Sequence, residues 1–222
     1  MIDVATSRAA FAAQIDVVVR LIDETHPAPP MVSPISREAR GLAVLLLFAA
    51  YEELLKSLTR TLLETAVRLR VSNKRLQPGF RAFAIHAAAK SLRDISGRKL
   101  FVSGIPALVT TVSHSTAPPT INPSDFPDDG SYMRRSQIET WARIFNTGHP
   151  SKILTRTWSG FDAIVSHRNA IAHGRLTPQE VGRTFTEADI RQLVDDWKSD
   201  WFDFLAHVEK LASSRDFFRT PR

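Results

Sequence analysis

A long apolar helix predicted over residues 36–70 is the feature that most constrains how this chain can fold. Large apolar residues recur in it at helical spacing, namely Leu42, Leu45, Leu46, Phe48, Leu55, Leu58, Leu62 and Val67. Ser36 is placed to cap its N-terminus. The middle of the segment is apolar nearly all round, which is typical of a helix that its neighbours cover on every side. We therefore expect a helical bundle built around one central helix.

Other stretches with helical periodicity or capping signals predict the helices that surround it. The first runs from a cap at Thr6 or Ser7 to about residue 23, with Phe11, Ile15, Val18 and Ile22 on one face. A second covers residues 80–95 and ends at Gly97, a third begins with a Ser136-x-x-Glu139 capping box, and a fourth covers residues 158–173. A short helical turn then begins with Thr177-Pro178-x-Glu180, and a long amphipathic helix begins with Thr186-x-x-Asp189. The proline-rich residues 25–34 connect the first two helices.

Two segments break this pattern. Residues 98–130 are rich in Pro, Ser and Thr, with β-branched patches, and predict an irregular insertion that has room for a short hairpin. Residues 214–222 predict a basic, frayed tail. We therefore expect a single domain over 1–222 of the all-α class, a bundle of about five to six helices with one irregular insertion.

The composition favours a polyanionic partner. The formal net charge is +6, and Arg outnumbers Lys by 22 to 7, which suits paired contacts to phosphate. Nucleic acid is the first such partner and an anionic membrane surface the second; the alternative is that the charge only keeps the protein soluble.

Several function classes are disfavoured. Cys is absent, which excludes disulfides and thiol chemistry. The sequence has no His-Glu-x-x-His motif, no cluster of acidic residues at metal-ligand spacing and no serine nucleophile elbow. We therefore expect no metal and no cofactor. The apolar run over 41–51 is too short to span a bilayer, and the first residues lack a signal-peptide layout, so we expect a soluble, cytoplasmic protein with no membrane partner.

The chemistry is concentrated in the sequence RNAIAHG at residues 168–174. It places a guanidinium, a carboxamide and an imidazole at the end of a predicted helix. A guanidinium binds phosphate oxygens in pairs, and an imidazole exchanges a proton near neutral pH. Residues five apart on a regular helix differ by about 140° in direction, so Arg168 and His173 can share a pocket only where the helix ends. Gly174 predicts that end, because glycine readily adopts the left-handed conformation.

Chance accounts for the bare Arg-x-x-x-x-His spacing. From 22 Arg and 7 His in 222 residues, about 0.7 such pairs are expected, and the spacing indeed occurs twice, also at Arg81 and His86. Requiring Asn after the Arg lowers the expectation to roughly 0.01. Only the pair that begins at Arg168 meets this requirement, because Asn169 follows it. We assign no function to the Arg81 pair.

A purely structural interpretation of the same residues stays open at this point. Arg168 could pair with Glu52 or Asp162, and Asn169 could be a hydrogen-bonding residue at the helix end. His173 could stabilise the helix C-terminus as a cation, which is worth about 0.3–1 kcal/mol, with Gly174 as the cap.

The sequence HRNAIAHG at residues 167–174 resembles the Arg-polar-x-x-x-His signature of the HEPN superfamily, in particular its RiboL-PSP type. Glu52-x-x-x-Lys56 on the central helix is similar to the Glu-x-x-x-Lys of the long buried helix in that family. A short Thr-led turn and an amphipathic helix follow the motif in both. The resemblance covers the helical elements from about residue 35 to residue 210.

The resemblance implies a metal-independent endoribonuclease of the toxin or phage-defence kind that works as a homodimer on RNA. Arg168, Asn169 and His173 would be catalytic, and four further residues would support them or bind phosphate. These are Glu52, Lys56, His167 and Arg175. An antitoxin or another defence-system partner protein is a further candidate partner. Some HEPN toxins carry a modifiable Tyr two residues after the His, whereas this chain has Arg175 there.

Two alternatives to a ribonuclease remain open. The first is a module that binds RNA or a nucleotide in the same pocket without cleaving it. The second is a helical dimerisation module in a defence or regulatory complex, in which the basic surface has no role.

Overall fold

The computed structural model describes residues 4–26, 33–114, 121–122, 125–126 and 134–220, and every regular element within them is helical. In chain order the longer helices are α1 (Ala5–Thr25), α2 (Pro34–Arg68), α3 (Pro78–Lys90), α5 (Ile105–His114), α6 (Arg135–Ile144), α7 (Phe161–Ala172) and α9 (Glu187–Ser213). Short elements join them, namely η1 (Asn73–Arg75), α4 (Gly97–Lys99), the π-helical turn η2 (Leu100–Gly104), η4 (Pro150–Lys152), α8 (Pro178–Gly182) and η5 (Arg215–Phe217). The all-α fold predicted from the sequence is confirmed.

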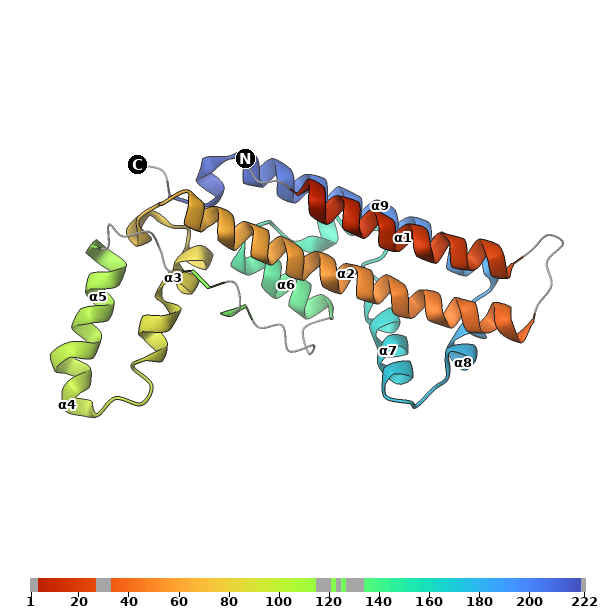
Figure 1. Ribbon diagram of the computed structural model, residues 1–222, viewed down its shortest axis with the longest axis horizontal. Helices are drawn as coiled ribbons and strands as arrows, with labels where there is room; N and C mark the ends of the chain where they lie inside the picture. Colours follow the sequence, from red (N-terminus) through yellow and green to blue (C-terminus); the bar gives the residue numbers. More distant parts are fainter. Residues whose placement is uncertain (1–3, 27–32, 115–120, 123–124, 127–133, 221–222) are drawn as a thin grey trace.

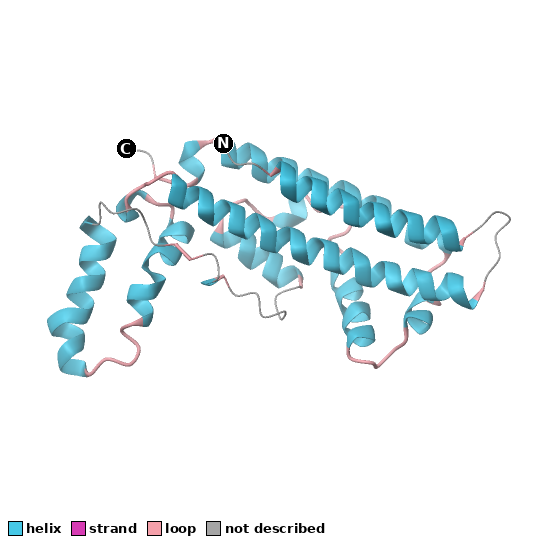
Figure 2. Cartoon of the chain, in the orientation of Figure 1, coloured by secondary structure: helices cyan, strands magenta, loops and turns pink. Residues whose placement is uncertain are grey.

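The central helix is α2, as predicted. It runs along the long axis of the molecule beside α1 and α9, while α6, α7 and α8 lie against its other side (Figures 1 and 2). It contributes more apolar side chains to the core than any other helix described, and Leu47, Tyr51, Leu58 and Leu62 are fully buried. Across the described part of the chain, none of the helices has both the length and the apolar character that a bilayer crossing requires.

A cluster of aromatic rings joins α2 to α7 and α9. The Tyr51 ring lies 5.1 Å from Phe48 and Phe161, 5.2 Å from Trp201 and 5.7 Å from Trp197, measured between ring centroids. Burying each such ring contributes about 1.5–3 kcal/mol, and favourable ring geometry adds about 0.5–1.5 kcal/mol per pair. We call these five rings the Tyr51 cluster.

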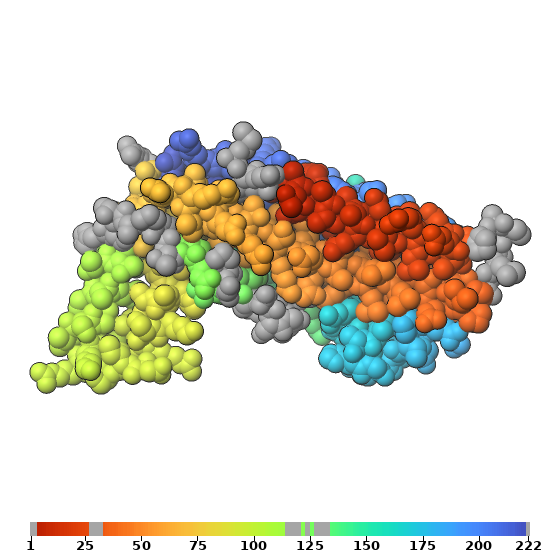
Figure 3. Space-filling model, in the orientation of Figure 1, coloured from red at the N-terminus to blue at the C-terminus, as the bar shows by residue number. Residues whose placement is uncertain are grey.

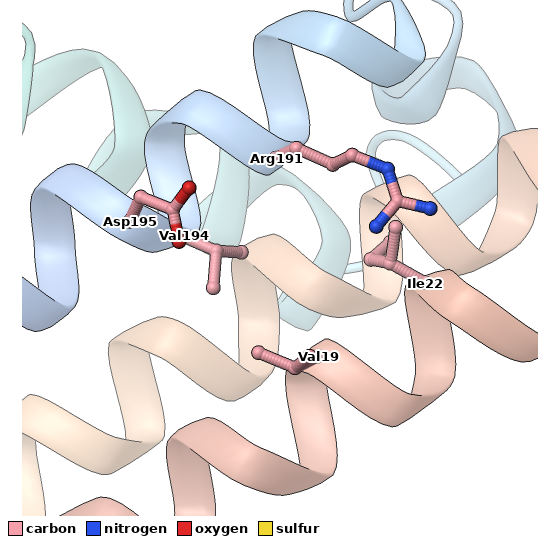
Figure 4. Close-up of a pocket in the computed structure, with 5 residues that line it drawn as sticks. All are labelled: Val19, Ile22, Arg191, Val194 and Asp195. Atoms are coloured by element: carbon pink, nitrogen blue, oxygen red, sulfur yellow. The ribbon is translucent and has the colours of Figure 1, made fainter.

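The predicted buried face of the first helix is confirmed, because Phe11, Ile15, Val18 and Ile22 are at most 1% exposed. Between α1 and α9 there remains a hollow of about 100 Å³ (Figure 4). Its lining residues are Val19, Ile22, Arg191, Val194 and Asp195. Arg191 also donates to Asp23 at 2.6 Å, so an ion pair joins α9 to α1 beside the hollow.

Two predicted caps are placed differently by the structure. Helix α2 begins at Pro34, and Ser33 rather than Ser36 caps it, accepting a hydrogen bond from the Ser36 N–H at 3.1 Å. Proline is favoured in the first turn of a helix, where its missing N–H costs nothing. Helix α1 is preceded by Val4, which provides no side-chain cap, and the predicted cap Ser7 instead lies within the helix.

Two helix starts also differ from the prediction. The Ser136-Glu139 capping box does not form, because α6 begins one residue earlier and the Gln137 side chain accepts from the Arg134 N–H. Helix α7 begins at Phe161, three residues after its predicted start at Trp158. By contrast, the predicted capping boxes at Thr177 and Thr186 are both present.

The predicted irregular insertion is wrong for residues 98–114, which are helical. Helix α3 ends at Lys90, earlier than predicted, and α4, η2 and α5 then return along it as a helical hairpin. The β-branched residues of α5 have weak intrinsic helix propensity, and packing against α3 outweighs it. The helix is continuous from residue 97, and Pro106 follows the π-helical turn η2, in which the Ile105 N–H donates to the Leu100 carbonyl. Residues 115–120, 123–124 and 127–130 of the predicted insertion lie outside the described residues.

The prediction of a frayed tail is wrong as far as residue 220. Phe217 and Phe218 are buried against Phe80, with ring centroids 5.7 and 5.1 Å from it. The Gln77 N–H donates to the Phe218 carbonyl at 2.9 Å, and the tail is thereby joined to the start of α3. The two consecutive phenylalanines supply the apolar area that the basic residues of the tail lack.

Two glycines allow α8 to lie directly against α2. Gly41 faces the Pro178 carbonyl, and Gly182 faces the Arg37 carbonyl, so a Cβ at either position would overlap backbone atoms. This backbone contact holds α8, and with it the turn that follows α7, against the N-terminal part of the central helix.

We expect Gly41→Ala to lower the free energy of unfolding by about 1–3 kcal/mol, because the backbone of α8 must move to accommodate a methyl group. Urea unfolding followed by circular dichroism measures the change. Gly97→Ala is the matched control, since nothing lies within 4 Å of a Cβ there. Equal stability of Gly41→Ala and the parent protein would show that the α2–α8 contact is not tight in solution.

Candidate functional site

Helix α7 ends as the sequence predicts. Gly174 adopts φ +66°, its N–H donates to the Ile171 carbonyl at 2.9 Å, and the Arg175 N–H donates to the Ala170 carbonyl at 2.8 Å. This pair of hydrogen bonds around a left-handed glycine is the Schellman arrangement, which satisfies the last carbonyls of a helix. His173 is therefore the C-cap residue that directly follows α7, and α7 ends at the tip of a projection that it forms with α8 (Figure 1).

The His173 side chain is available for chemistry. It is exposed, and within the described part of the chain its imidazole has no hydrogen-bond partner. Asn169 lies one helical turn before it, on the same side of α7, and its backbone carbonyl accepts from the His173 N–H at 3.0 Å. The two side chains therefore border the same surface at the end of the helix.

The Arg168 side chain is held by two contacts. Its guanidinium carbon lies 4.3 Å from the centre of the Phe48 ring, a cation–π contact worth about 0.5–1 kcal/mol at a half-buried site. Its Nη1 donates to Asn169 Oδ1 at 3.0 Å. Among the described residues no carboxylate lies within ion-pair distance of Arg168, so nothing in that part of the chain neutralises its charge.

Both carboxylates expected to pair with Arg168 have other partners. Glu52 accepts from Lys56 at 2.9 Å within α2. Asp162 accepts from the N–H and the guanidinium of Arg135 at 3.1 and 2.8 Å. Partial burial alone would raise the pKa of Asp162, but these contacts from Arg135 outweigh it and leave the pKa lowered. The expectation that Glu52 or Asp162 pairs with Arg168 is therefore wrong.

Glu52 and Lys56 nevertheless lie close to the motif. They follow Phe48 at intervals of four residues, so the ring under Arg168 and the ion pair share one stripe of α2. Burial, and then the Glu52 carboxylate, raise the pKa of the Tyr51 hydroxyl, while the nearby Arg168 cation opposes them. Glu52 and Arg168 are thus both close enough to Tyr51 to affect the pKa of its hydroxyl, in opposite directions.

His167 and Arg175 are not brought to Arg168. The His167 ring lies edge-on to Phe185, with centroids 5.7 Å apart. It borders an open cleft of about 480 Å³ that also contacts Phe185, Gln192 and Asp196, so it faces α9 rather than α2. Successive helical residues differ by about 100° in direction, which separates His167 from Arg168. Arg175 is exposed in the turn after Gly174.

The start of α7 is fixed by one buried carboxylate. Asp200 of α9 is fully buried and accepts from the Arg156 and Thr157 N–H groups at 3.0 and 2.8 Å. It also accepts from the Thr157 hydroxyl and the Arg156 guanidinium, both at 2.8 Å. The loop that leads into α7 is therefore tied to α9.

The sequence did not indicate two of these contributors. Phe48 was assigned only to the core, although it is the platform for Arg168, and Asp200 was not singled out at all. An acidic residue between two tryptophans on an otherwise apolar helix face, as at 197–201, was the available signal for Asp200, because a buried carboxylate needs several donors. No comparable signal marks Phe48.

The site offers an uncompensated guanidinium, a carboxamide that orients it and an exposed imidazole. Within the described ranges, no group of three or more His, Asp or Glu side chains is placed to hold a metal ion. These groups can bind a phosphate and move a proton.

The model of the HEPN_MAE_28990-like HEPN family matches residues 32–217, which include every residue of this site. The chain belongs to this HEPN family. The resemblance drawn from residues 167–174 and from Glu52 and Lys56 is thus confirmed at the level of the superfamily, and the family that matches is the MAE_28990-like one. No curated protein and no solved structure matches the chain.

In this HEPN domain we expect Asp200→Ala to lower the free energy of unfolding by about 3 kcal/mol or more, because it removes the acceptor of the buried Thr157 N–H and hydroxyl and of the Arg156 N–H. Thermal unfolding measures the loss. Asp203→Ala is the matched control: its side chain is 60% exposed and shares the Arg156 partner, so a change below about 1 kcal/mol is expected. Similar losses in the two variants would contradict the anchoring role of Asp200.

Proposed function

We propose that this HEPN domain is a metal-independent endoribonuclease of the toxin or phage-defence kind, acting in the cytoplasm. The observation that carries the proposal is the state of Arg168 and His173. Both carboxylates that could neutralise Arg168 are bound elsewhere, and His173 is exposed and without a hydrogen-bond partner among the described residues. An ion-pairing role for Arg168 would require a carboxylate partner, and a phosphate group fits the charge that is left.

In the proposed reaction, an imidazole takes the proton of a ribose 2′-hydroxyl, and the 2′-oxygen attacks the adjacent phosphorus. The bond between phosphorus and the 5′-oxygen breaks, and an imidazolium gives that oxygen its proton. The products are a 2′,3′-cyclic phosphate and a 5′-hydroxyl. Arg168, oriented by Asn169 and Phe48, would stabilise the charge on the phosphorane oxygens.

A base and an acid are both needed, and each chain offers one His173. A homodimer in which two α7 ends face each other would supply both, and the exposed projection of α7 and α8 leaves room for that contact. Glu52 and Lys56 would support the phosphate pocket from α2, and Arg175 would add charge at its rim. His167, which faces the cleft beside α9, would act at most indirectly. An antitoxin or another defence-system partner protein would control the activity.

We expect the purified chain to cleave RNA in excess EDTA. His173→Ala should lower the rate by about 10²- to 10⁴-fold through loss of proton transfer. Arg168→Ala should lower it by about 10²- to 10³-fold through loss of charge stabilisation. Gel analysis of a labelled RNA measures cleavage, and circular dichroism checks that both variants stay folded.

The matched control is His86→Ala, because Arg81 and His86 have the same five-residue spacing as Arg168 and His173. Their contacts are structural, since Arg81 donates to backbone carbonyls and His86 pairs with Asp125. It should cleave like the parent. Excess His173→Ala should also suppress the parent if the site is shared between two copies. Equal cleavage by parent and His173→Ala would overturn the proposal. Binding of RNA without cleavage, weakened in Arg168→Ala alone, would favour the binding module.

A further inference from the structure

The hairpin formed by α3, α4, η2 and α5 has no part in the site described above. It projects from one end of the bundle, on the same side as the α7–α8 projection (Figures 1 and 3). Among the elements that the structure describes, helix α5 makes its main contacts with α3, η1 and η2. Much of the hairpin surface is therefore open to a partner.

The hairpin tip is strongly basic. Lys90, Arg93, Arg98 and Lys99 are all exposed, and Asp94 is the one carboxylate over residues 90–114, so four cations less one anion give a net charge of +3 with His neutral. Among the described residues none of these four cations has an ion-pair partner. An unpaired cluster of this kind attracts a polyanion.

Apolar side chains are exposed on the same tip. Phe101 and Val102 are each 73% exposed, more than any other large apolar side chain described, and Val109 is 53% exposed. In the sequence, one residue separates Arg98 and Lys99 from Phe101 and Val102. An exposed aromatic ring beside unpaired cations is costly in water and indicates a binding surface.

We propose that this hairpin binds single-stranded RNA, with Phe101 stacking on a base and Arg98 and Lys99 contacting phosphates. Single-strand sites combine these two elements, since a base offers an apolar face and the backbone a regular row of charges. The choice of RNA as the ligand rests on the proposed ribonuclease function. The hairpin would add a second RNA-binding surface to that function. Because the hairpin and α7 lie on the same side of the bundle in Figure 1, a bound strand can continue toward the helix that carries the motif. An anionic membrane fits less well, because three apolar side chains give a weak anchor.

The test is fluorescence anisotropy of the full chain with a labelled single-stranded 2′-O-methyl RNA of about 20 nucleotides, which lacks the attacking hydroxyl and so reports binding without cleavage. Phe101→Ala should weaken binding about tenfold. Arg98→Ala/Lys99→Ala should lower the slope of log affinity against log salt by about 1.4, at about 0.7 per lost phosphate contact.

Matched controls lie elsewhere on the surface. Ile35→Ala removes an apolar side chain that is 66% exposed, and Lys198→Ala/Lys210→Ala removes two exposed cations of α9; both should bind within about twofold of the parent. Hairpin variants that bind like the parent, or a parent that does not bind, would overturn the proposal. So would loss of binding to phosphatidylglycerol vesicles in Phe101→Ala with RNA binding unchanged. Because cleavage is not measured, RNA binding by the hairpin would stand even if the ribonuclease proposal failed.

Discussion

Burial of the Tyr51 cluster determines where α2, α7 and α9 meet, and the site depends on that meeting. Phe161 at the start of α7 stacks on Trp197 of α9 and contacts Tyr51 of α2 edge-on. The Tyr51 cluster and Asp200 together hold the start of α7. Two helical turns later, Arg168 lies over the face of Phe48. The glycine contact between α2 and α8 holds the other side of the turn that ends α7. Core packing therefore positions the polar groups.

The arrangement of charge matters as much as the position. Glu52 and Asp162 lie near enough to Arg168 to affect the same tyrosine, yet each is engaged by another cation, Lys56 or Arg135. The guanidinium rests on an aromatic face, which holds its direction without neutralising its charge. A half-buried cation in this state binds an anion more strongly than a paired one, because no existing ion pair must be broken first. Glu52 is bound to Lys56 in this way and does not pair with Arg168.

Periodicity and capping chemistry predicted the bundle, the central helix, the buried face of α1 and the end of α7, because each depends on local spacing or on one special backbone conformation. Residues 98–114 were predicted wrongly, since contacts with α3 outweigh the weak helix propensity of their β-branched residues. The motif at residues 168–174 indicated the HEPN superfamily, which is confirmed, whereas the roles of Arg168, Asn169 and His173 stay predictions. The partners of Glu52 and Asp162 could not, because several cations lie at suitable sequence distances and only tertiary packing selects Lys56 and Arg135.

We propose that Arg168 and His173 act on the ribose and phosphate of RNA without a metal. The chemical ends of the fragments test this most directly, by mass spectrometry of a defined oligonucleotide cleaved in excess EDTA. Attack by the 2′-oxygen predicts a 2′,3′-cyclic phosphate and a 5′-hydroxyl, and a 2′-deoxy nucleotide at the cut position should block that cut alone. Fragments with 3′-hydroxyl and 5′-phosphate ends would contradict the account, because they require attack by water on the opposite bond.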